Sequence, residues 1–273
     1  MRIAAIGDIH RCFDEEDARW IDRANFDRVL FTGDLPGRWH QGMDEVARGL
    51  AALTTPAVMI PGNHDGPSVF ELLADQWGSA WSGRDSLDRF AVRGATFGQV
   101  ELGGYSVHPL TGDTALLVAR PLAMDGRKLS FAPAIERAYG VADLTASATR
   151  LKAVVDAHDA RRWVVLAHNG PAGLGAGREA PWGLGYRDLG DPDLAAVIDH
   201  LRGTGRSVPL VVAGHVHHRG DAGRRRWCVR DRGTTYVNAA RVPRHEQVGG
   251  SPRRHLVSID LDGDAVRVEA QTY

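Results

Sequence analysis

The chain has 273 residues, of which 43% are hydrophobic and 25% are charged, and its formal net charge is −1. This is the composition of a globular protein with a sizeable core, and it excludes an intrinsically disordered chain. Nowhere do about 18 uncharged apolar residues follow one another, so we predict a protein that does not span a membrane.

The N-terminus and the cysteines favour a cytoplasmic location. The first apolar run, residues 2–6, is broken at once by Gly7 and Asp8, and it lacks the core and cleavage site of a signal peptide. Two cysteines, Cys12 and Cys228, are too few for a disulfide framework. Cys12 is expected to be a buried structural thiol.

In the N-terminal part, short apolar runs alternate with helix-compatible stretches. The strand candidates end at corners that contain glycine, and they are residues 2–6, 28–31 and 57–60. The helix candidates follow them at residues 15–24, 43–53 and 68–77. This βαβαβα alternation favours a largely parallel sheet covered by helices. Residues 78–130 have several glycines and no clear period, so we expect loops or an insertion over the sheet.

The α/β pattern returns in the second half of the chain. The helix candidates there are residues 144–155, with apolar residues at helical spacing, and 191–202, with an Asp-Pro start. The strand candidates are residues 163–167 and 208–213. The C-terminal runs look like consecutive antiparallel strands, at residues 226–230, 234–238, 255–261 and 265–272.

A long loop rich in glycine and proline occupies residues 169–192. Loops of this length inside a compact domain are usually functional or mobile. Trp182 and Tyr186 lie in this loop, and two interpretations stay open for them. They either contact a substrate, by stacking on a base or covering the site, or they anchor the loop.

Polar side chains with metal-ligand chemistry stand at the ends of five predicted strands. They are Asp8 and His10, Asp34, Asn63 and His64, His168, and His215 and His217. The carboxyl edge of a sheet is where open α/β folds bind ligands, so we expect these side chains to converge. Carboxylate oxygen, amide oxygen and imidazole nitrogen all suit ions such as Mn²⁺, Fe²⁺ and Zn²⁺. The next residue, His218, is expected to face solvent.

Five ordered blocks of sequence resemble the calcineurin-like metallophosphoesterases. They are Asp8-x-His10, Gly33-Asp34, Gly62-Asn63-His64-Asp65, the lone His168, and Gly214-His215-Val216-His217. The resemblance implies a single domain over residues 1–273, with a four-layer α/β/β/α sandwich of two mixed β-sheets. The segment that begins at His168 and ends at Gly175 is similar to a bacterial and plastid branch of this superfamily, and no substrate follows from that similarity.

The resemblance also implies a dinuclear centre with two divalent metal ions, which are Mn, Fe, Zn or Ni. Asp8, His10 and His217 would hold one ion, Asn63, His168 and His215 the other, and Asp34 would bridge both. A hydroxide between the ions would attack phosphorus, and His64 would act as general acid. Asp65 either orients His64 or begins the next helix.

Arginines crowd the segment after the last metal motif, and they are Arg219, Arg224, Arg225, Arg226, Arg230 and Arg232. Guanidinium groups suit phosphate oxygens, so Arg219, with Trp182 and Tyr186, is a candidate substrate contact. A solvated hairpin is the alternative. Charge is also uneven along the chain: residues 1–160 hold 16 Lys and Arg against 22 Asp and Glu, whereas residues 161–273 hold 17 against 12.

These observations favour hydrolysis of a small phosphate monoester or diester. A nuclease acting on DNA or RNA is the alternative, supported by the arginines and the basic second half, although no nucleic-acid-binding module is recognisable. A catalytically inactive binding scaffold is a third hypothesis, which the complete ligand set disfavours. The segment after Gly33 lacks the Gly-Asp-x-x-Asp-Arg-Gly signature of serine/threonine phosphatases, so protein phosphatase activity is not expected. The oligomeric state does not follow from the sequence.

Overall fold

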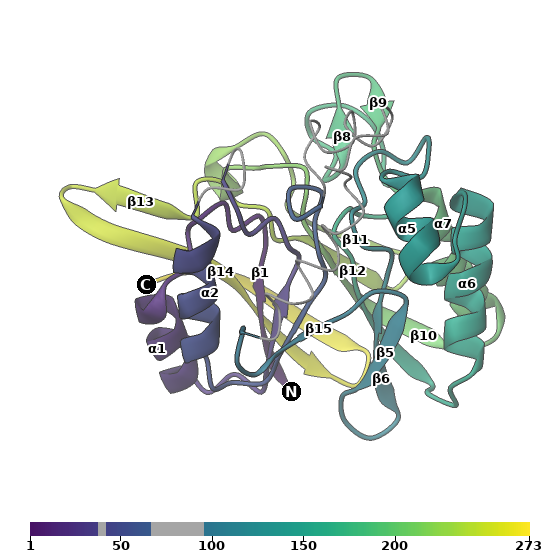
Figure 1. Cartoon of the computed structure of the whole chain (residues 1–273), viewed down its shortest axis with the longest axis horizontal. Coiled ribbons are helices and arrows are strands. Elements are labelled where there is room, and N and C mark those ends of the chain that lie inside the picture. Colours follow the sequence, from purple (N-terminus) through teal and green to yellow (C-terminus); the bar gives the residue numbers. More distant parts are fainter. Residues whose placement is uncertain (38–41, 67–95) are drawn as a thin grey trace, which may run out of the picture.

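Two large mixed β-sheets pack face to face, and helices cover the outer face of each (Figure 1). The structure is a computed structural model that describes residues 1–37, 42–66 and 96–273. The four layers agree with the α/β/β/α sandwich that the family resemblance implies. The predicted helix at residues 68–77 lies outside the described residues.

The first sheet has the strand order β13-β14-β1-β2-β3-β4, and β15 also pairs with β14. Strands β1 to β4 are parallel, and β14 is antiparallel to β1. The strands are β1 (Arg2–Ile6), β2 (Arg28–Phe31), β3 (Ala57–Met59), β4 (Val100–Leu102), β13 (His245–Val248), β14 (Ser251–Asp262) and β15 (Ala265–Thr272). Helices α1 (Glu15–Arg23) and α2 (Met43–Ala52) connect β1 to β2 and β2 to β3.

The second sheet has the order β11-β12-β10-β7-β6-β5, with four parallel strands between two antiparallel edges. The strands are β5 (Ser106–Pro109), β6 (Thr114–Val118), β7 (Arg162–Leu166), β10 (Ser207–Ala213), β11 (Cys228–Asp231) and β12 (Thr234–Asn238). The helices on this side are α5 (Ala132–Tyr139), α6 (Leu144–Asp156) and α7 (Pro192–Gly203). The short elements are β8 (Gly183–Leu184), β9 (Arg187–Asp188) and the 3-10 helix η3 (Gly220–Ala222).

Strand β1 shows why the molecule has four layers. Ile3 and Ala5 belong to the core between the two sheets, whereas Ala4 and Ile6 belong to the core under the helices. Successive side chains of a strand point to opposite faces, so an unbroken apolar run is buried on both sides. Val164 of β7 meets the same inter-sheet core from the second sheet.

Helix α1 is specified locally. The side chain of Asp14 accepts hydrogen bonds from the backbone N–H groups of Glu16 and Asp17, and the Asp17 carboxylate accepts one from the N–H of Asp14. This capping box satisfies N–H groups that the first turn of a helix leaves unpaired. Ala18 and Ile21 then face the core on one side of the helix.

Two expectations from the sequence differ from the structure. The described part of the loop-rich region, residues 96–130, contains β4, β5 and β6, and these strands complete one edge of each sheet. The C-terminal strands were expected to be consecutive and antiparallel, and β11 does pair with β12, and β14 with β15, in antiparallel order. The two pairs do not follow one another, however, because the first joins the second sheet and the other joins the first sheet. Strand β12 is buried along its whole length and pairs in parallel with β10, a partner that an apolar pattern cannot identify.

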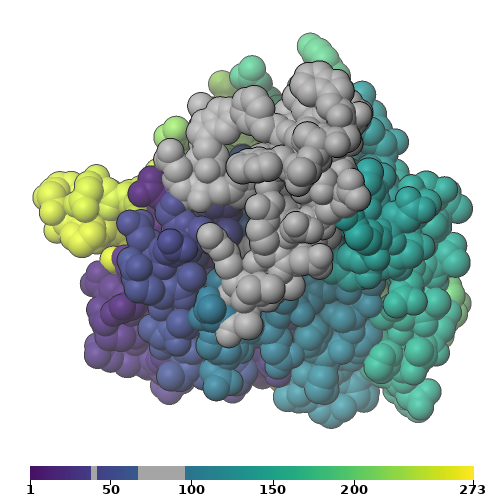
Figure 2. All heavy atoms as spheres, in the orientation of Figure 1, coloured from purple at the N-terminus to yellow at the C-terminus, as the bar shows by residue number. Residues whose placement is uncertain are grey.

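The turn between β13 and β14 projects beyond the body of the molecule (yellow in Figure 2). Residues 247–253 around this turn are exposed. Both cysteines are free thiols. Cys12 was expected to be buried, and it is only partly buried. None of the described helices is long and apolar enough to cross a membrane.

Candidate metal centre

The seven predicted metal ligands come together where strands of both sheets end. Strands β1, β2 and β3 of the first sheet and β7 and β10 of the second run directly into the segments that carry them. These strands lie near the middle of their sheets, so their carboxyl ends meet at one edge of the sandwich. The ligands are Asp8, His10, Asp34, Asn63, His168, His215 and His217.

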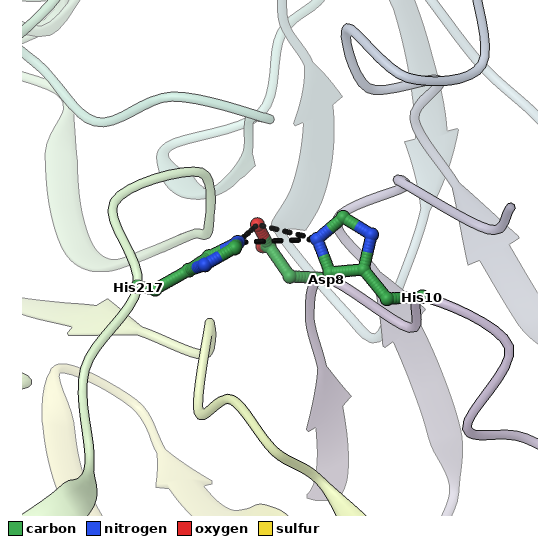
Figure 3. Close-up of side chains that lie close together, drawn as sticks. All are labelled: Asp8, His10 and His217. Carbon is green, nitrogen blue, oxygen red and sulfur yellow. Dashed lines mark hydrogen bonds and ion pairs between the residues drawn. The ribbon is translucent and has the colours of Figure 1, made fainter. Parts of the chain in front are cut away.

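One group of ligand atoms surrounds Asp8. The Nε2 atoms of His10 and His217 lie 3.1 Å apart, and Asp8 Oδ1 lies 4.0 Å from the first and 3.1 Å from the second. Figure 3 shows the Asp8 carboxylate between the two imidazole rings, each with a nitrogen directed at it. Asp8 Oδ1 is buried and has no hydrogen-bond partner among the described residues. A buried carboxylate oxygen without a donor is a natural position for a cation.

A second group surrounds Asn63. Its Oδ1 atom lies 2.9 Å from His168 Nε2 and 2.9 Å from His215 Nδ1. Asp34 stands between the groups, with Oδ1 3.6 Å from His168 Nε2 and Oδ2 3.9 Å from His10 Nε2. The two oxygens of one carboxylate therefore face two different sets of nitrogen atoms.

The histidine tautomers fit metal binding. His10 Nδ1 lies 3.2 Å from the carbonyl oxygen of Pro36, and His168 Nδ1 lies 2.6 Å from that of Thr32. A carbonyl oxygen only accepts hydrogen bonds, so in each neutral ring Nδ1 carries the proton and Nε2 presents its lone pair to the centre. Lone pairs and carboxylate oxygens that face one another repel, and a cation between them removes that repulsion. The residues present thus fit divalent metal ions.

The backbone at this edge is held in unusual conformations. Four of the seven ligands have positive φ angles: 49° at Asp8, 41° at His10, 56° at Asp34 and 72° at His215. Residues other than glycine rarely have positive φ angles, and backbone strain of this kind is concentrated at functional sites. A hydrogen bond of 2.8 Å from the N–H of His215 to Asp8 Oδ2 ties the two sheets together here.

Asp65 holds two of the strand ends in place. Its carboxylate accepts hydrogen bonds from the backbone N–H groups of Gly62, Asp34 and Leu35, at 2.7, 2.8 and 2.9 Å. Burial raises the pKa of Asp65 to about 7, although these three N–H groups favour its charged form. Within the described residues, the contacts of the Asp65 side chain thus position the backbone around Asp34. The helix that Asp65 was expected to begin lies outside the described residues.

Burial shapes the charge of the ligands. It raises the pKa of Asp34 well above its usual value, and the nearby carboxyl groups of Asp8 and Asp65 add to the rise. Burial also opposes the ionisation of Asp8, but the close approach of His217 and the other neighbouring imidazoles hold the pKa of Asp8 below its usual value. For His168, burial and the nearby His215 lower the pKa to about 3, which keeps the ring neutral and able to bind a metal.

His64 lies beside the centre with its side chain exposed. Its ring centroid is 5.1 Å from that of His10, in an edge-to-face arrangement. Its backbone N–H donates a 2.8 Å hydrogen bond to Asp34 Oδ1, which fixes the start of the side chain. Burial and the neighbouring His10 lower the pKa of the His64 ring.

The candidate substrate contacts have different surroundings. Tyr186 is fully exposed in the turn of the β8–β9 hairpin, at the top of Figure 1, and Arg219 is exposed two residues after His217. Trp182 is only 1% exposed, and its Nε1–H donates to the carbonyl oxygen of Gly214. The assignment of Trp182 as a substrate contact is therefore corrected, since no face of its ring is open to a ligand.

His218 is also a correction, because it is buried rather than solvent-facing. Its Nε2 atom lies 2.9 Å from the carbonyl oxygen of Asn238, and its Nδ1 atom accepts a hydrogen bond from the N–H of Gly220. Burial lowers its pKa to about 4, so the ring stays neutral. The sequence did not predict the burial of His218, because the residues around it come from distant strands.

Sequence reasoning missed two residues that support the ligand turn at 214–217. Asn238 donates through Nδ2 to the carbonyl oxygens of Pro181 and Val216. Arg225 donates to the carbonyl oxygens of His217, Ala180 and Gly183. Asn238 ends a buried strand, so the rule that found the metal ligands could have singled it out. Arg225 carries no signal that separates it from the other arginines of its cluster.

A family model described as calcineurin-like phosphoesterase matches residues 1–219, which include all seven candidate ligands. The chain belongs to the calcineurin-like phosphoesterase family. As a calcineurin-like phosphoesterase it is a metal-dependent hydrolase of phosphate esters. No curated protein matches the chain.

Solved structures share the fold of this calcineurin-like phosphoesterase at low sequence identity. One crystal structure superposes with a TM-score of 0.62 at 14% identity, covering 98% of each chain. The crystal structure of TT1561 from Thermus thermophilus has a TM-score of 0.57 at 14% identity, over 98% of this chain and 97% of that one. These likenesses concern the fold alone.

Proposed function

We propose that this calcineurin-like phosphoesterase hydrolyses small phosphate monoesters or diesters at a dinuclear metal centre, with His64 as general acid. The observation that carries the proposal is that Asp34 directs its two oxygens at two separate sets of ligand atoms. Asp8, His10 and His217 would hold one divalent ion, Asn63, His168 and His215 would hold the other, and Asp34 would contact both.

Two divalent ions at such a centre lower the pKa of a bound water and neutralise the charge that develops on a phosphoryl group. The chain itself supplies the frame for this chemistry. Asp65 fixes the backbone on both sides of Asp34, and the N–H of His215 fixes Asp8. Preorganised groups of this kind lower the cost of reorganisation during the reaction.

His64 is positioned to act on the leaving group. It is exposed, lies next to His10, and is not needed to complete either ligand set. A phosphate ester at the centre brings negative charge beside the ring, which favours its protonated form. From Nδ1 or Nε2 it can donate that proton to the oxygen of the departing alcohol, a contribution of roughly 10²–10⁴ in rate.

Metal removal and reconstitution test the dinuclear centre. We expect the chelator-treated protein to be inactive, and to bind two Mn²⁺ ions per chain when it is reconstituted. Cleavage of p-nitrophenyl phosphate or bis-p-nitrophenyl phosphate should return with Mn²⁺, Fe²⁺, Zn²⁺ or Ni²⁺. Absence of cleavage with all four metals, despite bound metal, would contradict the hydrolase proposal and favour a binding scaffold.

A leaving-group series tests His64. A p-nitrophenolate ion departs without help, whereas an alkoxide needs a proton. His64→Ala should therefore lower kcat by roughly 10²–10⁴ for alkyl phosphate esters and much less for p-nitrophenyl esters. Metal content should stay at two ions per chain. An equal loss for good and poor leaving groups would remove His64 from the proton-transfer step.

A substrate panel at fixed Mn²⁺ tests the substrate class. Phosphomonoesters, cyclic nucleotides, phosphodiesters and oligonucleotides should be compared, with Arg219→Ala and Tyr186→Ala as variants. Small esters should be cleaved with little dependence on salt, and the two variants should raise KM. Strong cleavage of oligonucleotides that weakens steeply with added salt would instead indicate the nuclease alternative.

A further inference from the structure

We infer that Trp182 is a positioning residue for one half of the metal centre, the set formed by Asn63, His168 and His215. This inference rests on the proposed dinuclear centre, because it concerns how one of its two ligand sets is held. Trp182 reaches that set through the backbone segments on which His168 and His215 stand.

The first contact fixes the entry to His215. The Nε1–H of Trp182 donates a 2.9 Å hydrogen bond to the carbonyl oxygen of Gly214, the residue just before His215. Both partners are buried. His215 has a positive φ of 72°, so the preceding peptide must be held in one orientation for the ring to reach the centre.

The second contact fixes the exit from His168. Gly170 lies two residues after His168, and a Cβ atom there would be 2.1 to 2.4 Å from three atoms of the Trp182 ring. The ring therefore lies directly against the Gly170 backbone, a position that only glycine allows. The N–H of Gly214 also donates to the carbonyl oxygen of His168 at 2.7 Å, which joins the two backbone segments. The Trp182 side chain therefore contacts both of them.

Trp182 is itself held firmly by its neighbours. Asn238 donates to the carbonyl oxygen of Pro181 at 2.9 Å, and the N–H of Leu189 donates to that of Trp182 at 2.9 Å. Arg225 donates to the carbonyl oxygens of Ala180 and Gly183, both at 2.6 Å. A ring anchored on both sides is able to transmit its position to the segments it touches.

Arg225 connects the Trp182 segment to the other half of the centre. Besides its contacts with the Trp182 segment, its Nε–H donates to the carbonyl oxygen of His217 at 3.2 Å. His217 belongs to the other set, with Asp8 and His10. A change that merely loosens the loop should weaken both ions, whereas loss of the indole contact should weaken only the ion held by His168 and His215.

The test is Mn²⁺ binding by Trp182→Phe, which keeps an aromatic ring and removes the N–H donor. Groups that orient metal ligands typically change affinity 10- to 100-fold when they are mutated. We expect one of the two Mn²⁺ ions to bind about tenfold more weakly. At intermediate Mn²⁺ the electron paramagnetic resonance spectrum should lose the signal of coupled ions and match that of Asn63→Ala, not that of His10→Ala.

Trp163→Phe is the matched control. Trp163 lies in the same hydrophobic core, is fully buried, and donates its indole N–H to the carbonyl oxygen of Ala160 at 3.0 Å. It stands near the start of β7, at the end of the strand away from His168. The same substitution there should lower thermal stability while both Mn²⁺ affinities stay within twofold of wild type.

Three outcomes separate the inference from the proposed function. If Trp182→Phe binds both ions like wild type, or weakens both equally, the positioning role is wrong and the dinuclear centre stands. If wild type itself binds no pair of ions, the proposed function fails first. Should Trp182→Phe not fold, the ¹⁵N indole signal of Trp182 in wild type serves instead. It must shift as Zn²⁺ fills the site that Asn63→Ala lacks, and an unchanged signal overturns the inference.

Discussion

Asp34 concentrates the chemistry of the centre in one side chain. Its Oδ2 faces His10, and its Oδ1 faces His168 while accepting the N–H of His64. The nearby carboxyl groups of Asp8 and Asp65 make its negative charge costly unless a cation compensates it. Asp34 therefore favours metal binding but destabilises the fold when no metal is bound.

Asp34→Asn tests both effects of this carboxylate, on metal binding and on the stability of the metal-free protein. The amide has the same size and no charge, so we expect the bound Mn²⁺ to fall from two ions per chain to one or none, with at least a hundredfold loss of activity. In chelator-treated protein the melting temperature should be equal to or higher than that of wild type, because like charges have been removed. Equilibrium dialysis and calorimetry measure the two effects. A variant that retains two tightly bound ions would show that Asp34 does not bridge them.

At the scale of the elements, the ends of the strands matter more than the strands themselves. The corner after β3 must pass between Asp34 and His168. A Cβ atom at Gly62 would lie 2.3 Å from Asp34 Oδ1 and 2.5 Å from His168 Cε1. Both neighbours are buried candidate ligands and cannot move aside without leaving the centre.

Gly62→Ala should therefore damage the centre while leaving the strand intact. We expect Mn²⁺ affinity to fall at least tenfold and stability to fall by about 1–3 kcal/mol, the usual cost of overpacking. Gly203→Ala at the end of α7 is the control, because within the described part of the chain no atom outside its own helical turn lies within 4 Å of the added methyl group. There we expect unchanged metal binding and a gain in stability of up to about 1 kcal/mol. Unchanged metal affinity in Gly62→Ala would contradict the packing argument.

Across the whole molecule, Asp17 joins the N-terminal helix to the C-terminus. Its Oδ1 atom accepts hydrogen bonds from Arg244 Nη2 at 2.8 Å and from the hydroxyl of Tyr273 at 2.7 Å. Its Oδ2 atom lies 3.0 Å from both His245 Nε2 and Arg254 Nη1. These partners anchor the base of the β13–β14 hairpin, so one buried carboxylate links α1, this hairpin and the last residue of the chain.

Asp17→Asn should destabilise the fold by about 3–5 kcal/mol, because it leaves the buried guanidinium of Arg244 without its counter-charge. Urea unfolding at pH 7 measures this loss. Glu15→Gln on the same helix is the control, since its pair with Arg19 is exposed and should contribute less than about 1 kcal/mol. A loss in Asp17→Asn no larger than that in Glu15→Gln would show that the buried network adds no stability.

The same residue predicts a pH dependence. Burial opposes the ionisation of Asp17, but Arg244 and His245 hold its pKa far below the usual 3.8. The stability from a depressed acid pKa is complete above the unfolded value and is lost as the pH falls below it. Wild type should therefore lose stability between about pH 4 and pH 2, and Asp17→Asn should lose less over that interval. Parallel losses in the two proteins would place the acid sensitivity elsewhere.

The core between the sheets suggests that the described layers unfold as one unit. Ile3, Leu30 and Val58 of the first sheet share this core with Val164 and Val212 of the second. Neither sheet can bury that face alone, so we propose a single domain and expect one calorimetric transition whose van't Hoff and calorimetric enthalpies agree. Two resolved transitions would contradict this.

Several parts of the fold and of the site were predictable because their causes are local. The apolar runs of β1, β2, β7 and β10 predict buried strands. The polar residues that follow these runs must therefore lie at the strand ends. Since neighbouring parallel strands end at one edge of a sheet, Asp8 and Asp34 could be expected to converge. His168 follows a strand of the other sheet, so its approach to them also depends on how the two sheets pack. The division of these residues into two ligand sets came from the family resemblance, not from the strand pattern.

Other features depended on partners that are remote in the chain. Asp65 accepts two of its hydrogen bonds from residues about thirty positions earlier, and His218 and Trp182 are buried by strands from other parts of the sequence. The choice of sheet for β12 and β14 is of the same kind. By itself the sequence determined which side chains stand at the strand ends, because that follows from short-range periodicity. Only the tertiary structure decided which of the remaining polar and aromatic groups support them, because burial and hydrogen bonding depend on contacts that periodicity does not encode.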